Sequence, residues 1–356
     1  MRAPSHERRS ATVVRERATV SMDELTSADA LEALAPEWRA LWARSPSATP
    51  FQSPDWLLPW WRHFGRGEPL VLALRDAGAL VGVAPFYTFH DGAGRPGRLV
   101  LLGTGNSDRL DALFDAGFEE RGAGAVLARV TAGGRDWDVC DLQRLAPSSP
   151  LLAAASPDGV TSDVVEEEPC PVLSLPASAE GIEAVVSRGF ARRLDYYARR
   201  AARAGVVRVE AADERTLGEQ LDALFALHEA RWRRRHEPGT LGDPVVRSFH
   251  REAAAALLRG GALRCYALRL GGRIIAVYHG FADRRRSYYY LGGFDPELET
   301  LSPGSLLVAH AVREAMREGA REVDFLRGRE PYKYRWGATD RPTYRRLLRR
   351  RLAAGP

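Results

Sequence analysis

Apolar residues recur with helical spacing in several stretches of the chain. Within residues 27–43, Leu31, Leu34, Trp38 and Leu41 fall on one face of a helix. A second helix begins at Ser53, and its periodic positions are aromatic, as expected of a helix packed in a core. The same pattern predicts further helices over 118–132, 179–204, 217–235, 245–258 and 302–319.

Short apolar runs bounded by turn residues predict strands between these helices. An edge strand is expected at 12–22, and further strands at 69–75, 80–89, 98–102, 137–142, 171–175, 274–281, 287–291 and 322–326. The last two strands flank the helix that begins near residue 302, which makes a βαβ crossover. The start of that helix then points to the carboxyl edge of the sheet.

The chain also contains an internal repeat. Ala73-Leu74-Arg75 recurs 194 residues later as Ala267-Leu268-Arg269, and the same shift carries Gly78 onto Gly272 and Val83 onto Val277. Asp141-Leu142 corresponds to Asp324-Phe325 later in the chain. Because both correspondences occur in the same order, we expect two copies of one α/β domain. The expected divisions are a disordered tail at 1–11, a first domain at 12–145, a connection at 146–170 and a second domain at 171–356.

Charge and cysteine content narrow the function classes. The 51 Lys and Arg residues against 46 Asp and Glu give a net charge of +5, which suits an anionic ligand but is too small to indicate nucleic-acid binding. The arginines within 192–203 form either a solvated helix face or a wall for an anionic substrate. Three isolated cysteines without a CxxC pair, and no apolar run of membrane length, predict a cytoplasmic protein without metal or membrane span.

Ser302-Pro303-Gly304-Ser305 opens the helix of the crossover and is the leading candidate for ligand binding. The free N–H groups and the dipole of a helix start attract phosphate, and glycine allows close approach. The alternative is an ordinary helix cap.

Several motifs together resemble a known family. They are Phe51-Gln52-Ser53-Pro54-Asp55-Trp56, Gly82-Val83-Ala84-Pro85, Ser107-Asp108, Ser302-Pro303-Gly304, Asp324-Phe325-Leu326-Arg327-Gly328 and Glu330-Pro331-Tyr332-Lys333-Tyr334-Arg335-Trp336-Gly337. They resemble the CelD-type acetyltransferases associated with cellulose and other exopolysaccharide biosynthesis, which carry duplicated, FemAB-like GNAT domains. The resemblance implies an α/β (α+β) fold of tandem GNAT-like acyl-CoA N-acyltransferase domains. Because the first half lacks an SPG-like loop, it resembles a degenerate copy.

The resemblance also implies direct acyl transfer from acetyl-CoA or another acyl-CoA. The phosphate cradle would comprise Ser302, Pro303, Gly304, Ser305 and Leu306, and the backbone of Leu291 and Gly292 would polarise the thioester. Alternation in the strand 274–281 places Ile275, Val277 and His279 on one face. The candidate catalytic residues are His279, Asp324, Glu330 and Tyr334, and the candidate substrate-binding residues are Arg327, Tyr332, Lys333 and Trp336.

Alternatives stay open for several of these residues. His279 is a base or a core histidine, and Asp324 is an acceptor-binding carboxylate or half of a buried ion pair with Arg327, Arg329 or Lys333. Tyr332 or Tyr334 would protonate the departing thiolate, and Trp336 shields the site or closes the core. The expected acceptor is an amine or hydroxyl of a sugar, a polysaccharide precursor or another small molecule. The rival functions are a FemAB-like aminoacyltransferase that uses aminoacyl-tRNA and a non-catalytic partner in a polysaccharide-synthesis complex.

Overall fold

The computed structural model describes residues 20–90, 92, 97–132, 137–177, 181–233 and 239–350. The tail expected at 1–11, and most of the edge strand expected at 12–22, lie outside these residues. None of the described helices is both long and apolar enough to cross a membrane.

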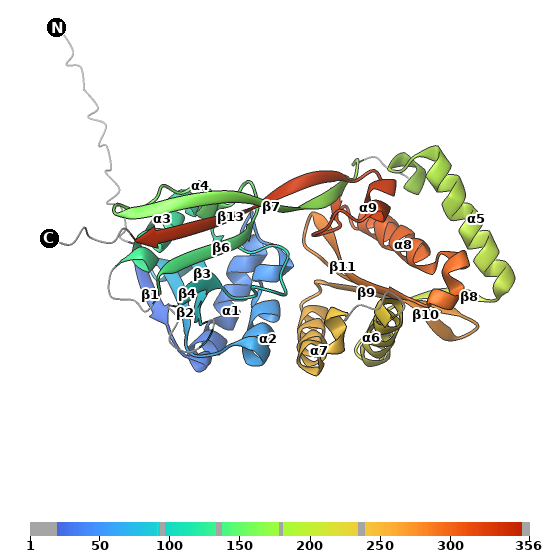
Figure 1. Ribbon diagram of the computed structural model, residues 1–356, viewed down its shortest axis with the longest axis horizontal. Helices are drawn as coiled ribbons and strands as arrows, with labels where there is room; N and C mark the ends of the chain where they lie inside the picture. Colours follow the sequence, from blue (N-terminus) through green and yellow to red (C-terminus); the bar gives the residue numbers. More distant parts are fainter. Residues whose placement is uncertain are drawn as a thin grey trace, which may run out of the picture.

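One large mixed sheet runs through both halves of the molecule (Figure 1). Its strands in the described residues are β1 Ser21–Leu25, β2 Pro69–Asp76, β3 Ala79–Phe89, β4 Arg98–Leu101, β5 Leu113–Phe114, β6 Val139–Leu145, β7 Val160–Ser174, β8 Val207–Ala211, β9 Leu263–Leu270, β10 Arg273–Ala282, β11 Arg286–Phe294, β12 Glu322–Asp324 and β13 Thr339–Arg350. Their order is β1-β2-β3-β4-β6-β13-β7-β12-β11-β10-β9-β8, with β5 paired to β3.

Helices cover both faces of this sheet. They are α1 Ala28–Arg44, α2 Pro54–Phe64, α3 Glu119–Thr131, α4 Pro150–Ala153, α5 Arg188–Ala204, α6 Leu217–Arg233, α7 Pro244–Arg259, α8 Pro303–Arg317 and α9 Pro331–Arg335, with 3-10 turns η1 Pro50–Gln52, η2 Ile182–Ala184, η3 Thr240–Gly242 and η4 Pro296–Leu301. We call β1–β6 with α1–α3 the N lobe, and β8–β12 with α5–α9 the C lobe.

The two lobes have the same hairpin at the same register, as the internal repeat predicts. In the N lobe Ala73 of β2 pairs with Val83 of β3, and in the C lobe Ala267 of β9 pairs with Val277 of β10. Both hairpins shift register by one residue just before the turn. The prediction of an α/β fold with a duplicated hairpin is confirmed.

The lobes exchange their last strands. β7 follows the N lobe in the chain but pairs with β12 of the C lobe, whereas β13 follows the C lobe and pairs with β6 of the N lobe. β7 and β13 also pair with each other over most of their length, and together they bridge the lobes at the top of Figure 1. The stretch 146–170, expected as a connection, therefore supplies α4 and most of a strand of the shared sheet.

Three buried clusters hold this arrangement together. One lies under α3 in the N lobe, and another lies under α8 in the C lobe. The third joins α1 and α2 to α6 and α7, so it belongs to both lobes. At its centre the Trp56 ring lies 4.8 Å from that of Phe249 and 5.3 Å from that of Phe281. Since such aromatic pairs add to an already large apolar burial, the lobes pack as one body.

The largest difference between the lobes lies in the strand after the hairpin. β11 is continuous, but its N-lobe counterpart is split into β4 and β5. By register, Phe114 of β5 pairs with Gly82 where Phe294 of β11 pairs with Ala276. Residues 102–112 therefore form an excursion, which we call the 102–112 loop. Its Asn106 carbonyl accepts a hydrogen bond from the Tyr290 hydroxyl of the C lobe at 2.7 Å, and its Asp108 forms an ion pair with Arg327.

Candidate functional site

A free strand edge lies at the centre of the C lobe. β12 pairs in parallel with β11 only from Arg286 to Tyr288, and then ends at Asp324. From Tyr289 to Phe294, β11 pairs with β10 on one side and with no described strand on the other. Its backbone groups on that side are thus available to a ligand, as at any exposed sheet edge.

The start of α8 lies beside this edge. Ser302 adopts a left-handed conformation (φ 48°, ψ 50°) that turns the chain out of η4, and Pro303 is the first helical residue. The N–H of Leu306 donates to the Ser302 carbonyl at 3.2 Å, which makes the first helical hydrogen bond. The N–H groups of Gly304 and Ser305 precede it and are the orphan donors of this helix. The first turn contains no acidic residue, so its dipole is free to attract an anion.

These two features line one cleft of about 240 Å³, which we call the α8 cleft. Its walls come from β10, β11, η4, α6, α8 and α9: Arg231, Val277, Tyr278, Tyr289, Gly292, Gly293, Phe294, Glu299, Ser302, Pro303, Gly304, Ser305, Leu307, Val308, Tyr332, Arg335 and Trp336. Of the predicted residues, Gly292, Ser302, Pro303, Gly304, Ser305, Tyr332 and Trp336 are brought together here.

Three tyrosine rings line the α8 cleft. The Tyr278 and Tyr289 rings stack at 4.6 Å, and the Tyr332 ring lies edge-on to Tyr289 at 6.3 Å. Burial raises the pKa of Tyr289 to about 12, and it also raises the pKa of Tyr278 and Tyr332, so all three phenols are neutral at physiological pH. The Tyr278 hydroxyl already donates to the Tyr288 carbonyl at 3.3 Å, which leaves Tyr289 and Tyr332 as hydrogen-bond donors to a ligand.

Two arginines supply positive charge at the same cleft. Arg231 of α6 lies over the Phe294 ring at 5.6 Å, and Arg335 belongs to α9. Neither forms an ion pair with a carboxylate in the part of the chain that the structure describes. Arg231, Arg335, Tyr278 and Tyr289 were missed because their elements meet only in the fold.

Other predicted residues lie elsewhere. The Leu306 N–H is already used inside α8. The Leu291 side chain packs in the core shared by the lobes, whereas its backbone, on which the predicted role rests, belongs to the free edge of β11. Tyr334 points away from the cleft, since its hydroxyl donates to Asp340 at 2.7 Å and its side chain is exposed. Glu330 is the exposed N-cap of α9 and pairs with Lys333 at 2.9 Å. Neither Glu330 nor Tyr334 lines the α8 cleft.

Lys333 and Arg327 hold the backbone rather than a ligand. The buried Lys333 Nζ donates to the carbonyl oxygens of Leu326 and Gly328 at 3.0 and 3.2 Å. Arg327 pairs with Asp108 of the 102–112 loop. Because the charges of Lys333 and Arg327 are used in contacts inside the protein, neither residue is placed to bind a substrate as predicted.

His279 is a core residue in this structure. Its side chain is 1% exposed, lies among His250, Phe281 and Tyr290, and has an unpartnered Nδ1. A register shift between Ile274 and Ala276 breaks the alternation that the sequence suggested, because Ile275 packs under α8. Burial lowers the pKa of His279 to about 4, which makes it a poor proton acceptor at neutral pH.

Asp324 is half of a buried ion pair, although with a different partner from those expected. Its Oδ2 accepts from Nη2 of Arg109 at 2.8 Å, and its Oδ1 accepts from the Leu326 N–H at 2.8 Å. Arg109 belongs to the 102–112 loop of the N lobe, so no sequence spacing within the C lobe indicated it. The pair fastens one lobe to the other.

The corresponding place in the N lobe is closed. Phe114 is fully buried, and a Cβ added at Gly122 of α3 would lie 2.6 Å from its ring. A Cβ at Gly304 of α8 would meet the equivalent Phe294 at an ordinary 3.5 Å. The first turn of α3 also carries Glu119 and Glu120, which disfavour an anion.

Comparison with known proteins finds a similarity in the C lobe. Residues 188–334 match the family profile of the acetyltransferase (GNAT) domain. This part of the chain is therefore similar to GNAT domains. The matched residues include α8 and the residues of the α8 cleft other than Arg335 and Trp336. No curated protein matches the chain.

Solved structures with the same fold extend over both lobes. FemX is 12% identical, with a TM-score of 0.62 over 88% of this chain and 95% of its own. A conserved protein of unknown function from Bacteroides thetaiotaomicron is 10% identical, with a TM-score of 0.60 over 93% of this chain and 100% of its own. The C-terminal domain ascribed to a lysylphosphatidylglycerol synthetase of Agrobacterium fabrum is 12% identical, with a TM-score of 0.57 over 91% and 93%. At these identities the likeness concerns the fold of the GNAT-like domain and its N-lobe companion.

No metal chemistry is built into the described ranges. No group of three or more His, Cys, Asp or Glu side chains within them is arranged to hold a metal ion. The three cysteines are buried and unpaired with one another.

Proposed function

We propose that the C lobe is an acyltransferase that takes its acyl group from an acyl-CoA, with acetyl-CoA as the expected donor. The observation that carries the proposal is the free edge of β11 beside the uncharged start of α8. A pantetheine arm has amide groups that can pair with a free strand edge, and a pyrophosphate suits the N–H groups of Gly304 and Ser305. Arg231 and Arg335 add the positive charge that such a donor requires.

The reaction that fits this geometry is direct transfer. The acceptor's amine or hydroxyl attacks the thioester carbonyl, the carbon–sulfur bond breaks, and the proton that the acceptor loses passes through water to the departing sulfur, which leaves as free CoA. Backbone N–H groups on the free edge of β11 can stabilise the oxyanion that develops on the carbonyl. Tyr289 and Tyr332 line the cleft as neutral phenols, so either can donate a hydrogen bond to the departing sulfur.

A sugar, a polysaccharide precursor or another small molecule remains the proposed acceptor. The link to exopolysaccharide synthesis rests on the CelD-type motifs alone, and the cytoplasmic location stays a prediction.

An aminoacyl-tRNA is the second candidate donor, and one observation favours it. Exposed arginines without an ion pair in the described residues cover α5, which packs against η4 and α8: Arg188, Arg192, Arg193, Arg199, Arg200 and Arg203. Such a helix suits a polyanion, and FemX, whose name matches the FemAB-like alternative, has the same fold. Competition between CoA and tRNA in the calorimetric experiment below would separate the two donors.

Titration calorimetry with acetyl-CoA tests the proposal directly. Gly304→Val should weaken acetyl-CoA binding at least tenfold, about 1.4 kcal/mol, because the larger side chain blocks approach to the helix start. The substitution should leave the fold intact, since a Cβ here meets only Phe294 at 3.5 Å.

The matched control is Gly124→Val on α3, where a Cβ meets nothing within 4 Å. It should change helix stability in a similar way and leave acetyl-CoA affinity unchanged. If the wild-type protein binds tRNA but no acyl-CoA, the aminoacyl-tRNA donor replaces acyl-CoA, and if it binds neither, the role of non-catalytic partner replaces the enzyme.

A further inference from the structure

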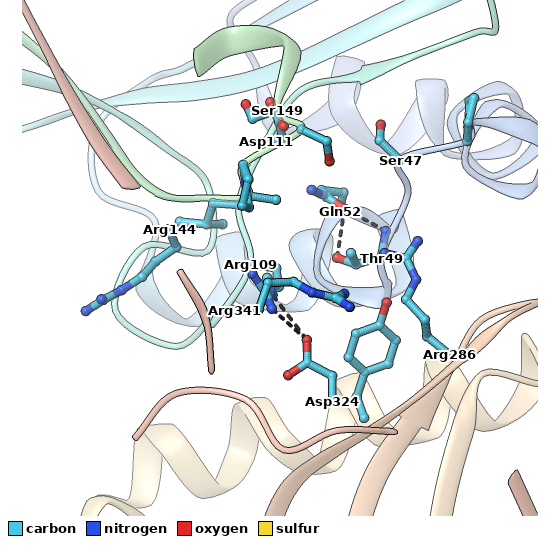
Figure 2. Close-up of a pocket in the computed structure, with 16 residues that line it drawn as sticks. Ser47, Thr49, Gln52, Arg109, Asp111, Arg144, Ser149, Arg286, Asp324 and Arg341 are labelled. Carbon is cyan, nitrogen blue, oxygen red and sulfur yellow. Dashed lines mark hydrogen bonds and ion pairs between the residues drawn. The ribbon is translucent and has the colours of Figure 1, made fainter. Parts of the chain in front are cut away.

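A second cavity, separate from the α8 cleft, lies between the lobes (Figure 2). Its volume is about 370 Å³, and no residue lines both. Its walls are the segments 46–52, 109–111 and 144–149 of the N-lobe side, the starts of β11 and β13, and the end of β12. We call it the interlobe cavity.

Positive charge predominates on its walls. Four arginines line it, Arg109, Arg144, Arg286 and Arg341, against two carboxylates, Asp111 and Asp324. Three of these arginines pair with carboxylates that do not line the cavity: Arg144 with Glu167, Arg286 with Asp283 and Arg341 with Glu322. Those pairs fix the guanidinium groups in place and offset much of their charge, so the cavity wall offers oriented N–H donors rather than a strongly cationic surface.

Arg109 has donor capacity that the protein does not use. Its Nη2 and Nε donate to Asp324 at 2.8 and 3.3 Å, but its Nη1 is buried without a hydrogen-bond partner. The side chain is only 6% exposed, so little water reaches it. A buried, unsatisfied donor on a charged group is costly, and it is rare unless a ligand or water completes it.

The opposite wall carries a carboxyl group without a cationic partner. Figure 2 shows Asp111 and Ser149 across the cavity from Arg109, Arg341 and Asp324. Burial raises the pKa of Asp111 to about 7, although hydrogen bonds from Ser149 and from the backbone of Ala112 and Leu151 lower it in part. A protonated Asp111 can donate a hydrogen bond to an acceptor in the cavity.

We propose that the interlobe cavity binds an oxyanion, the carboxylate or phosphate group of a small molecule, through Arg109 and Arg341. A planar guanidinium presents paired donors that match both groups. Arg109 contributes the guanidinium whose Nη1 has no partner among the described residues, and Arg286 and Arg144 place further guanidinium groups on the cavity wall. Because Arg109 belongs to the N lobe and Arg341 to β13, such a ligand joins elements from both ends of the chain. The site does not depend on acyl transfer.

Binding should depend on pH through Asp111. Above its pKa the ionised carboxylate adds a second negative charge to the cavity beside Asp324 and opposes an anion. The other charged groups that face it, Arg109, Arg144, Arg286 and Arg341, keep their charge at neutral pH. Affinity for an anion of constant charge should therefore fall between pH 6 and pH 8, about one unit either side of the pKa of Asp111.

Anion titration by calorimetry and thermal unfolding tests the proposal. The probes are sodium sulfate, for a phosphate-like ligand, and sodium acetate, for a carboxylate, each against sodium chloride at equal ionic strength. We expect one or both to bind the wild-type protein and to raise its melting temperature beyond the chloride control. Sulfate alone would indicate a phosphate ligand, and acetate alone a carboxylate.

Arg109→Lys should reduce the affinity for the anion that binds, sulfate or acetate, at least tenfold while keeping a cation beside Asp324. The matched control is Arg98→Lys on β4, whose arginine is the register counterpart of Arg286, is half exposed and lies outside the cavity. Asp111→Asn should remove the loss of sulfate affinity between pH 6 and pH 8.

If Arg109→Lys does not fold, Arg341→Lys makes the same test, since its side chain is 40% exposed and tolerates change. The proposal is overturned if neither anion binds better than chloride. It is also overturned if the folded variant at Arg109 or Arg341 binds as tightly as Arg98→Lys.

Discussion

The two lobes repeat the same scaffold down to single side chains, yet Phe114 fills the place in the N lobe that corresponds to the α8 cleft of the C lobe. Arg75 pairs with Glu37 of α1 at 2.6 Å and donates to the Gly78 carbonyl at 3.1 Å. Arg269 repeats both contacts, with Glu219 of α6 at 2.5 Å and with the carbonyl of the matching turn at 3.1 Å. These partly exposed pairs add little energy each, so their repetition indicates common descent of the hairpins more than a demand of stability.

The lobes differ where a ligand would bind. α8 begins with Ser-Pro-Gly-Ser and has no acidic residue in its first turn, whereas α3 begins with Glu119 and Glu120. The Glu119 carboxylate accepts the Gly117 N–H at 2.7 Å, so a negative charge is held beside this helix start. Under the proposed function, one copy of the fold leaves its helix start open to an external anion, and the other copy places acidic side chains there.

Because the N-lobe strand is split into β4 and β5, the N lobe has an extra loop that contacts the C lobe. The 102–112 loop leaves the sheet where β11 of the C lobe continues, and it carries Asp108 and Arg109 across to the C lobe. The N lobe therefore supports the C lobe through this loop, which also forms a wall of the interlobe cavity.

The largest effect expected from this comparison concerns the two equivalent aspartates. Asp324→Asn should lower the free energy of unfolding by about 3 kcal/mol, because it leaves the buried Arg109 without its counter-charge. Asp141→Asn should cost less, about 1–2 kcal/mol, because its partner Arg345 is 32% exposed and can turn to water. Urea unfolding of both variants measures the difference. Equal losses of unfolding free energy in the two variants would mean that the Asp324–Arg109 pair contributes no more to stability than the Asp141–Arg345 pair.

The second effect tests whether charge at the helix start separates the lobes. Ser305→Glu gives α8 the acidic first turn of α3, and we expect acetyl-CoA affinity to fall about 100-fold, near 2.8 kcal/mol. Stability should hold or rise, since a carboxylate suits a helix N-terminus. Calorimetry and thermal unfolding measure both.

The reciprocal control replaces Glu119 and Glu120 of α3 by serine. It should create no acetyl-CoA binding, because Phe114 fills the space that is open in the C lobe. Weak loss of affinity in Ser305→Glu would show that the start of α8 does not hold the phosphates.

The smallest effect concerns acid sensitivity. Burial lowers the pKa of His279 to about 4, against an ordinary value near 6.5. The unfolded chain therefore takes up the proton first, and stability is lost as pH falls from about 6.5 toward 4. At pH 5 this loss should be on the order of 2 kcal/mol for His279 alone.

His279→Phe should remove that part of the loss, since its neighbours are aromatic, and should leave the stability at pH 7 nearly unchanged. His90→Phe, at an exposed position in the N lobe, is the control. Urea unfolding at pH 7 and pH 5 measures the effect. An unaltered pH dependence in His279→Phe would exclude this histidine as its source.

Much of the fold could be predicted from the sequence. The hairpins at 69–89 and 263–282, the helix capped by Ser27 and the crossover helix after Ser302 follow from local patterns and from the repeat. The cradle at Gly304 and Ser305, with Tyr332 and Trp336 in one cleft, was likewise predicted. Local sequence determines these features.

The remainder depends on contacts between distant segments. The exchange of β7 and β13 between the lobes cannot be predicted from the periodicity of either strand. A strand has the same pattern of apolar and polar residues whether it pairs within its own lobe or with the other lobe. The expected partner of Asp324 lay nearby in the chain, whereas Arg109 is brought to it by the 102–112 loop. His279 is buried against His250 of α7 and Tyr290 of β11, contacts that the pattern of its own strand could not show.

Hydrogen–deuterium exchange with and without acetyl-CoA tests most directly the claim that only the C lobe binds the donor. The ligand should slow exchange of backbone amides in 289–294 and 302–308 of the C lobe. The equivalent N-lobe segments, 98–101, 113–114 and 119–125, should exchange at unchanged rates. Protection of the N-lobe segments, or of neither set at saturating acetyl-CoA, would contradict this account.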